Sequence, residues 1–181
     1  PEYDDEMIEK WIEGKTGFPF LDACIKFLKI NGWINFRMRA MIMSFASYNM
    51  WQPWQKTSPL LAELFTDYEP GIHISQVQMQ SGVTGINLPR IYSVTKQSMD
   101  QDPNAEWIKC LIPELNKLDP KEIHDANCNG FYLPKIVDLK ASAKFARDQV
   151  WSLRKNKAFK DEAKLVYLKH GSRRKRNIKT N

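Results

Sequence analysis

Two arginines lie inside the most apolar stretch of the chain, and their charge demands an explanation. Arg37 and Arg39 fall between Ile34 and Ala46, a stretch that would be apolar on most sides of a helix. A guanidinium in apolar surroundings needs a carboxylate or a phosphate as its partner. The stretch therefore predicts a buried helix with an anionic group, from the protein or from a ligand, beside it.

A row of amides further along the chain indicates a polar cavity. Gln76, Gln78 and Gln80 alternate with Val77 and Met79. A period of two is typical of a strand, but the flanking glycines and the number of amides fit a loop or a short helix better. Either of these would line a polar cavity, and the sequence leaves both open.

The composition is that of a folded protein with a mild excess of positive charge. With 181 residues, 43% hydrophobic and 12% aromatic, the chain can bury the core of one domain. Its formal net charge of +6 permits a polyanionic partner such as DNA without establishing one. Much of that charge lies in a short basic tail over 171–181, which is typical of a solvated end: Arg173, Arg174, Lys175, Arg176 and Lys179.

Cysteine and histidine usage argues against several kinds of site. Three dispersed cysteines outside any C-x-x-C spacing predict reduced thiols in an intracellular protein, which we expect in the cytoplasm. Together with three scattered histidines they predict no metal site. No window reaches the roughly 18 apolar residues of a membrane span, and no secretory signal is present, so no membrane partner is expected.

Helix-starting and helix-stopping residues divide the chain into segments that predict an all-α fold. Pro19 suits the first position of a helix, and Gly32 a helix end. A loop is expected over 82–92 and a long connection over 120–134. The expected helices are 4–11, 19–30, 33–51, 60–65, 104–111, 141–153 and 157–170.

The stretch from Trp11 to Trp54 carries a family signature. It contains W-x-x-G-x-T-G-x-P, then D-A, then G-W, then an arginine-bearing helix and a Trp. In this order the motifs resemble the flavin-binding helical domain of the photolyase/cryptochrome family. Segments similar to later family motifs continue to about Arg154: L-F-T-D-Y-E, R-I-Y-S-V-T-K-Q, I-P-E-L and Y-L-P-K-I-V-D. So many motifs in order argue against chance similarity.

The resemblance implies that the domain folds around FAD. Asp67 would pair with Arg39 beside the flavin ring, which also satisfies the guanidinium; an ordinary structural ion pair is the alternative. Tyr68 and Glu69 would line the polar edge of the ring. His73 would face the flavin N5, where it either supplies a proton near neutral pH or acts only as a hydrogen-bonded polar residue.

The resemblance also implies a face that meets damaged DNA. Phe36, Arg37, Met79 and Gln97 occupy positions near DNA in the family, and Arg37 matches a residue that contacts a phosphate. Phe36 stands where the family has an Asn that helps hold flavin and lesion. Met79 stands where it has a Trp of the lesion pocket. DNA-type contacts are therefore expected at Arg37 and Gln97, with an altered lesion pocket.

Trp54 is the candidate for electron transfer. It matches the middle Trp of the family's electron-transfer chain. The first Trp of that chain would fall at Val77, which cannot be oxidised, so the relay is broken at its start. Trp51 or Trp33 would have to offer a detour.

Three functional hypotheses follow from the resemblance. The first is FAD-dependent, light-driven DNA repair by the parent protein, in which light-excited reduced flavin donates an electron to a flipped pyrimidine dimer. The second is a cryptochrome-like blue-light receptor domain without repair activity. The third is a cofactor-free DNA-binding helical remnant, whose binding would weaken with salt.

The sequence matches only the later part of the family's pattern. The family's antenna domain and the segment that holds the FAD phosphates lie upstream of the matching motifs. We therefore expect residues 1–170 to form a partial FAD-binding domain that binds FAD weakly or not at all by itself. The upstream half of the photolyase-like protein would be its partner, and damaged duplex DNA a second one.

Overall fold

The structure, a computed structural model, describes residues 3–84, 90–128 and 130–170 and has no strand within these ranges. The predicted all-α fold is confirmed. The basic tail over 171–181 lies outside the described residues. The elements are α1 (Asp5–Ile12), α2 (Pro19–Asn31), α3 (Phe36–Ser44), η1 (Phe45–Asn49), α4 (Trp54–Ala62), α5 (Pro70–Gln80), α6 (Val94–Gln101), α7 (Glu106–Leu111), η2 (Pro113–Leu115), α8 (Pro120–His124), α9 (Leu139–Lys155) and α10 (Lys157–His170).

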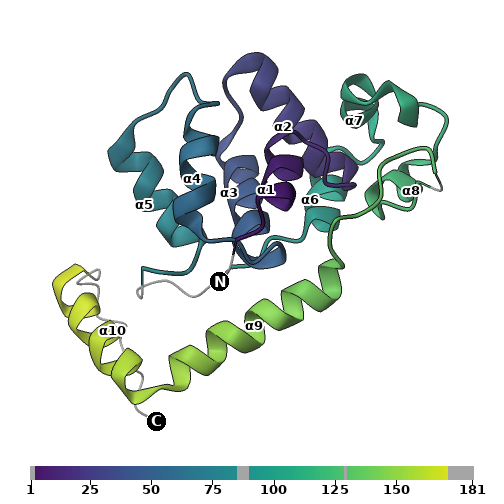
Figure 1. Cartoon of the computed structure of the whole chain (residues 1–181). Helices are drawn as coiled ribbons and strands as arrows, with labels where there is room; N and C mark the ends of the chain where they lie inside the picture. The colour runs from purple at the N-terminus through teal and green to yellow at the C-terminus, as the bar shows by residue number, and fades with distance from the viewer. Residues whose placement is uncertain (1–2, 85–89, 129, 171–181) are drawn as a thin grey trace, which may run out of the picture.

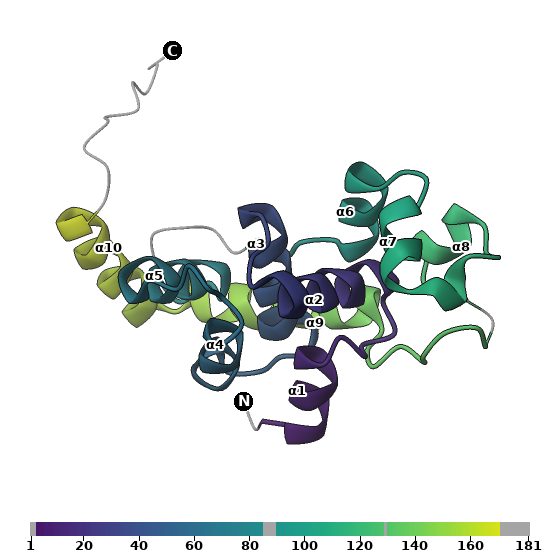
Figure 2. The same ribbon diagram turned by 90° about the horizontal axis from the view of Figure 1, so that it is seen from above.

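Helices α1 to α6 form a bundle, and the remaining helices pack around it. In Figures 1 and 2, α5 lies at one end of this bundle and α7 and α8 at the other. The long helix α9 runs along one side and packs against η1, and α10 turns away from the end of α9 and packs against it. The core is centred on α2, α3 and η1, whose fully buried side chains include Leu21, Ile25, Met41 and Phe45.

The turn between α1 and α2 is built around a buried carboxylate. Pro19 is the first residue of α2, a position where its missing N–H costs nothing. The side chain of Asp22, fully buried, points back at the turn. It accepts the N–H of Thr16 at 2.8 Å, the hydroxyl of Thr16 at 2.6 Å and the N–H of Gly17 at 3.0 Å. These bonds satisfy donors that the irregular turn leaves without helical partners.

The same carboxylate ties this turn to a distant part of the chain. Tyr132, 110 positions further along the sequence, donates its hydroxyl to Asp22 at 2.9 Å. Beside it the N–H of Ile136 donates to the carbonyl of Thr16 at 3.0 Å. Burial raises the pKa of Asp22, and the four hydrogen bonds donated to its carboxylate act in the opposite direction. The hydrogen bonds therefore offset the free-energy cost of burying the Asp22 carboxylate, which would be large without partners.

Glycine is required where the turn between α1 and α2 touches the segment around Pro134. Gly17 has a φ of 80°, in the left-handed region that side chains rarely adopt. A Cβ at this position would lie 2.3 Å from the carbonyl oxygen of Pro134. The close approach of these two backbones therefore accounts for the glycine in the T-G-x-P part of the signature.

The long helix predicted over 33–51 proves to be shorter and interrupted. Asn35 caps α3, which begins at Phe36 and ends at Ser44. The chain then makes a π-helical turn over Phe45–Asn49, and Trp51 follows with a φ of 54°. A π turn leaves no mark in a hydrophobic pattern, so the sequence predicted one continuous helix.

The helix expected over 60–65 proves to be α4, which begins earlier, at Trp54, and ends at Ala62. Three further helices also bear on the prediction. The amide-rich segment forms α5, which decides between the loop and the short helix; Glu69 caps it by accepting the N–H groups of Gly71 at 3.1 Å and Ile72 at 2.7 Å. α6 was not predicted, because its sequence, V-T-K-Q-S-M-D-Q, is too polar to show apolar periodicity. α8 was not predicted either, because it is a helix of only 5 residues inside the connection expected over 120–134.

Asp22→Asn should destabilise the fold strongly. The amide keeps one acceptor oxygen but turns an NH2 group toward donors, so at least one buried donor loses its acceptor, at a cost of about 1–3 kcal/mol per donor. Tyr132→Phe removes a single hydrogen bond and should cost only about 0.5–1.5 kcal/mol. Urea unfolding of both variants measures the difference. Equal stability of Asp22→Asn and the wild type would contradict the role assigned to the network.

Candidate functional site

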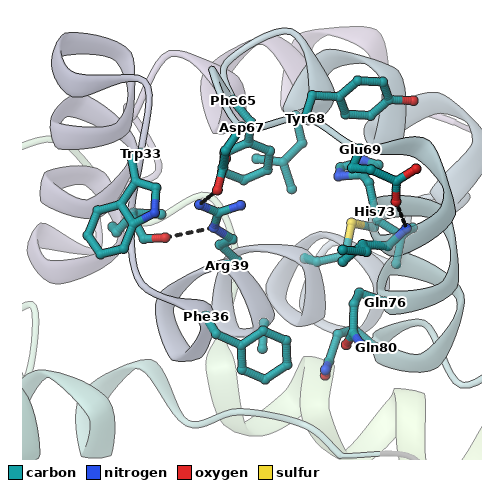
Figure 3. Close-up of a pocket in the computed structure, with 16 residues that line it drawn as sticks. Trp33, Phe36, Arg39, Phe65, Asp67, Tyr68, Glu69, His73, Gln76 and Gln80 are labelled. Carbon is teal, nitrogen blue, oxygen red and sulfur yellow. Dashed lines mark hydrogen bonds and ion pairs between the residues drawn. The ribbon is translucent and has the colours of Figure 1, made fainter.

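A cavity of about 340 Å³ opens between α3, α4 and α5, as Figure 3 shows. Small-molecule sites span about 300–1,000 Å³, so this cavity lies at the lower end. Its lining includes four of the chain's exposed large apolar side chains, those of Trp33, Phe36, Tyr68 and Ile72. Exposed apolar side chains gathered around one cavity indicate a binding surface, whereas scattered ones do not.

All five residues predicted to bind a cofactor line this cavity: Arg39, Asp67, Tyr68, Glu69 and His73. They come from α3, from the loop after α4 and from the first turn of α5. The structure thus brings together residues that are far apart in the sequence. Their contact with a cofactor stays a prediction.

Arg39 is fixed by three contacts on the cavity wall. Its Nη2 donates to Asp67 Oδ2 at 2.9 Å and its Nε to the carbonyl of Ile34 at 2.6 Å. Its guanidinium carbon lies 4.1 Å from the centre of the Phe65 ring, a cation–π contact. The predicted pairing of Arg39 with Asp67 is confirmed.

The ion pair orients charge more than it stabilises the fold. The side chain of Asp67 is 48% exposed, and exposed ion pairs contribute about 0–1 kcal/mol. The hydrogen bond from Arg39 lowers the pKa of Asp67, so the carboxylate is ionised at neutral pH. The result is a guanidinium held at a fixed place beside the cavity.

The loop that carries Asp67 is anchored to the end of α2. Gly32 ends α2 with a φ of 65°, and its carbonyl accepts the N–H of Thr66 at 2.9 Å and the hydroxyl of Thr66 at 3.1 Å. A Cβ at Gly32 would lie 2.3 Å from the Thr66 side chain. The glycine of the G-W motif therefore helps position Asp67 opposite Arg39.

His73 is half-buried in the wall and is bonded to α4. Its Nε2 lies 3.0 Å from Ser58 Oγ and 3.1 Å from the carbonyl oxygen of Ser58. Since a carbonyl only accepts, that bond forms when Nε2 carries the proton, and Nδ1 is then the acceptor. The rings of Phe65 and Tyr68 contact its ring edge to face. These contacts support the reading of His73 as a hydrogen-bonded wall residue, because its proton is already engaged by the protein.

Glu69 has a structural duty that the sequence did not predict. Both of its carboxylate oxygens accept backbone N–H groups of the first turn of α5, so they are engaged by the protein itself. Tyr68, by contrast, is 45% exposed beside the cavity and is free to contact a ligand.

Gln76 is a cavity residue that the site prediction missed. Gln76 lines the cavity. Its side-chain oxygen is buried and has no hydrogen-bond partner in the described structure. A buried acceptor without a partner costs free energy unless a ligand or water supplies a donor. The signal in the sequence was the alternation of amides, which indicated a polar cavity without saying which amide faces it.

The four residues predicted to meet DNA do not share one cavity. Phe36 lines the first cavity, whereas Arg37 and Gln97 line a second one of about 650 Å³. Arg37 is exposed, although its apolar neighbours suggested burial, because α3 turns it away from the core. Met79 is half-buried on α5 and lines neither cavity.

Trp54 lies apart from the first cavity. It is half-buried at the start of α4 and lines another cavity of about 300 Å³ together with Trp51. Val77, at the expected position of the first relay Trp, is buried and lines the first cavity. No aromatic side chain therefore stands at the place where the relay would begin.

Within the described ranges no group of three or more His, Cys, Asp or Glu is placed to hold a metal ion. No helix among them has the length and apolar character to cross a membrane. Cys24 and Cys128 are buried and Cys110 is exposed, all as free thiols.

Acidification should destabilise the fold through His73. Burial is the main cause that lowers the pKa of His73, the hydrogen bond to the carbonyl of Ser58 raises it, and the charge of Arg39 lowers it further. A histidine with a lowered pKa contributes stability above its ordinary value of 6.5 and loses it as the pH falls through the lowered value. NMR titration should therefore find His73 below 6.5, and His73→Gln should flatten the acid side of the stability profile. A His73 ring that titrates above 6.5 would contradict the expected burial effect.

Comparisons with known proteins give this geometry a context. Residues 1–152 match the family model described as the FAD binding domain of DNA photolyase. A deoxyribodipyrimidine photo-lyase of Alkalihalophilus pseudofirmus is 30% identical over 125 residues, which cover 68% of this chain and 26% of the relative. A chloroplastic/mitochondrial cryptochrome DASH of Solanum lycopersicum is 31% identical over 140 residues, 76% of this chain and 24% of the relative.

Solved structures agree with the sequence matches. An archaeal photolyase from Sulfolobus tokodaii, solved with two FAD molecules, superposes with a TM-score of 0.77 at 26% identity, over 83% of this chain and 36% of that one. A cryptochrome from Synechocystis superposes with a TM-score of 0.74 at 22% identity, over 81% of this chain and 33% of that one, a likeness of fold alone. The chain spans only about a quarter of the length of the curated relatives named above.

Proposed function

The chain belongs to the FAD-binding domain family of DNA photolyases, and from this premise we propose that the cavity between α3 and α5 holds the ring of FAD. The observation that carries the proposal is the Arg39–Asp67 ion pair on the wall of that cavity. It presents a fixed positive charge to whatever lies beside it. When bound, FAD supplies a light-absorbing redox centre at this place.

The residues present fit a flat ring with polar edges. Trp33, Phe36 and Tyr68 offer aromatic surface, and the unpartnered oxygen of Gln76 can accept an N–H group. The cavity is small for a dinucleotide, however, so the ribose and phosphates would need further walls. This supports the expectation that the described residues alone bind FAD weakly and that an upstream half completes the site.

Arg39 would stabilise negative charge on the bound ring. Its three contacts hold the guanidinium in place before a ligand enters, so little reorganisation is needed when charge develops nearby. Asp67 keeps Arg39 oriented and offsets part of its charge. His73, neutral and bonded to Ser58, contributes a hydrogen-bonding edge and not a positive charge at neutral pH.

For the whole protein we propose light-driven repair of pyrimidine dimers in DNA. Phe36 lies on the rim of the first cavity, and its neighbour Arg37 faces the second. A strand that crosses the start of α3 would therefore meet an apolar side chain and a cation in succession. Gln97 in the second cavity and Met79 on α5 would contact the DNA further along. The similarity to a deoxyribodipyrimidine photo-lyase supports this proposal.

A cryptochrome-type blue-light receptor is the second candidate, and one observation favours it. Val77 and Met79 stand where the family resemblance would put two tryptophans. Without these rings the lesion pocket lacks a stacking wall and the electron relay lacks its first member. The cryptochrome DASH relatives support this alternative at similar identity.

Arg39→Gln should weaken FAD binding about tenfold or more, because it removes a charge-assisted hydrogen-bonding group beside the ring. The measurement is the flavin absorption retained after incubation with FAD and desalting, together with quenching of flavin fluorescence. Arg37→Gln is the matched control, since it removes the same charge two positions away on the same helix. In a wild type that retains flavin, alone or completed by the upstream helices of a relative, equal flavin retention in Arg39→Gln would sink the proposed ring site.

Blue light should remove cyclobutane pyrimidine dimers from a duplex when the chain is loaded with FAD. If the chain alone stays colourless, the upstream helices of a relative can be supplied to complete the site. Dimer loss is followed by chromatography of the digested DNA, with a dark sample as control. Flavin loading and light-induced spectral change without dimer loss would instead favour the receptor candidate.

A further inference from the structure

The second cavity gathers positively charged side chains, and no carboxylate is among the described residues that line it. Arg37 enters from α3, Arg90 from the segment before α6, and Arg147 from α9. Lys96 also lines the cavity and pairs with Asp100 at 3.0 Å. Over the described parts of the chain, none of the three arginines has an ion-pair partner of this kind, so their charge is available to an anionic ligand.

Two buried polar side chains in the same cavity also have no partner. Tyr48 is 2% exposed and Gln97 7% exposed, and neither the phenol oxygen of Tyr48 nor the side-chain oxygen of Gln97 has a hydrogen-bond partner in the described structure. Both residues line the cavity. An amide can present its oxygen or, when turned, its NH2 group. Buried polar groups left unpaired are costly, and two in one cationic cavity point to a ligand that pairs with them.

The backbone around Tyr48 is irregular in a way that serves this cavity. Tyr48 lies in the π-helical turn Phe45–Asn49, and such turns are frequent at functional sites. Trp51 follows in a left-handed conformation that is costly for a large side chain. Since α9 packs against η1, the turn presents Tyr48 toward the helix that carries Arg147. A role of the π turn in holding the Tyr48 hydroxyl for a ligand would account for the strained backbone at Trp51.

An aromatic side chain stands among the cations. Trp151 is 49% exposed on α9, one turn after Arg147, and lines the same cavity. A flat ring such as a nucleobase can stack on an indole, here on the face that Arg154, 6.0 Å from the ring centre, does not cover. Cations for a phosphate and an indole for a ring are the two elements that recognise a nucleotide.

We infer that this cavity binds a single nucleotide unit, with its phosphate at Arg37, Arg90 and Arg147, its base against Trp151, and Tyr48 and Gln97 as hydrogen-bonding groups at its floor. Its volume of about 650 Å³ lies within the range of small-molecule sites. The inference shares Arg37 and Gln97 with the DNA contacts proposed above. It goes beyond them, because it assigns the cavity to one nucleotide and needs neither flavin nor a lesion. The nucleotide can be a free mononucleotide or the phosphorylated end of a nucleic acid strand, since both present the same phosphate and base.

The hydroxyl of Tyr48 is a donor over the whole physiological range. Burial raises the pKa of Tyr48 to about 12, and the charge of Arg154 acts in the opposite direction. The phenol is therefore protonated near neutral pH and can donate to a phosphate or hydroxyl oxygen. Because this hydroxyl has no partner in the described structure, its removal gives a clean test.

Titration calorimetry of the full chain with AMP tests the inference, with inorganic phosphate and adenosine as the two separate halves of the ligand. AMP should bind more tightly than either half. Tyr48→Phe and Arg147→Gln should each weaken AMP binding about tenfold. Lys144→Gln, which removes one charge from the same helix outside the cavity lining, should leave it unchanged.

Stability measurements separate a binding role from a structural one. Tyr48→Phe removes a buried hydroxyl without a partner, so it should leave the urea midpoint unchanged or raise it while AMP binding falls. If AMP and phosphate fail to bind at millimolar concentration, or if Tyr48→Phe and Arg147→Gln bind AMP as the wild type does, the inference is overturned.

Competition identifies the source of the nucleotide. If strand ends are the source, a short single-stranded oligonucleotide with a 5′-phosphate should displace AMP better than the same strand without the phosphate. If the two strands displace AMP equally and AMP binds more tightly than either, the source is a free nucleotide. Arg39→Gln should bind AMP normally. Of these two variants, Arg39→Gln alone should lose flavin binding, and Tyr48→Phe alone should lose AMP binding.

Discussion

A single buried carboxylate closes this fold. Asp22 accepts four hydrogen bonds, three from the turn that precedes its own helix and one from Tyr132. It thereby links the start of the bundle to the segment that leads into α9. α9 in turn provides one wall of the second cavity through Arg147. The second candidate site depends on this link, because it requires α9 to lie against η1.

The family signature separates into residues that build the fold and residues that face a ligand. Thr16, Gly17, Pro19 and Asp22 serve the buried turn, and none of them lines the first cavity. Gly32 affects the cavity indirectly, because its carbonyl binds Thr66 and so fixes the loop that carries Asp67. A match to the first block of motifs is therefore strong support for the architecture, whereas support for a bound ring comes from the later residues.

What could be predicted from the sequence was mostly local in origin. α1 and α2 have boundaries marked by residues that act within one turn, such as Asp4, Pro19 and Gly32, so their positions followed from residue type. The π turn and α6 could not be predicted. The π turn depends on hydrogen-bond spacing, and α6 is buried by packing against elements distant in the sequence, α2 and α8 among them.

The candidate site likewise has features that could be predicted and features that could not. The resemblance predicted the residues that line the first cavity and the pairing of Arg39 with Asp67. It missed the engagement of Glu69 by the N–H groups of α5. The unpartnered oxygens of Gln76 and Gln97 could not be predicted either, because burial of a polar atom is set by neighbours that are distant in the sequence.

The bond between Asp22 and Tyr132 also governs when the domain can mature during synthesis. Ribosomes add about 5–20 residues per second, so the 110 positions between these residues take roughly 5–20 s to appear. Throughout that interval Asp22 has the donors of its own turn and lacks the hydroxyl of Tyr132. The turn can therefore be closed by the later segment only after Tyr132 has been synthesised.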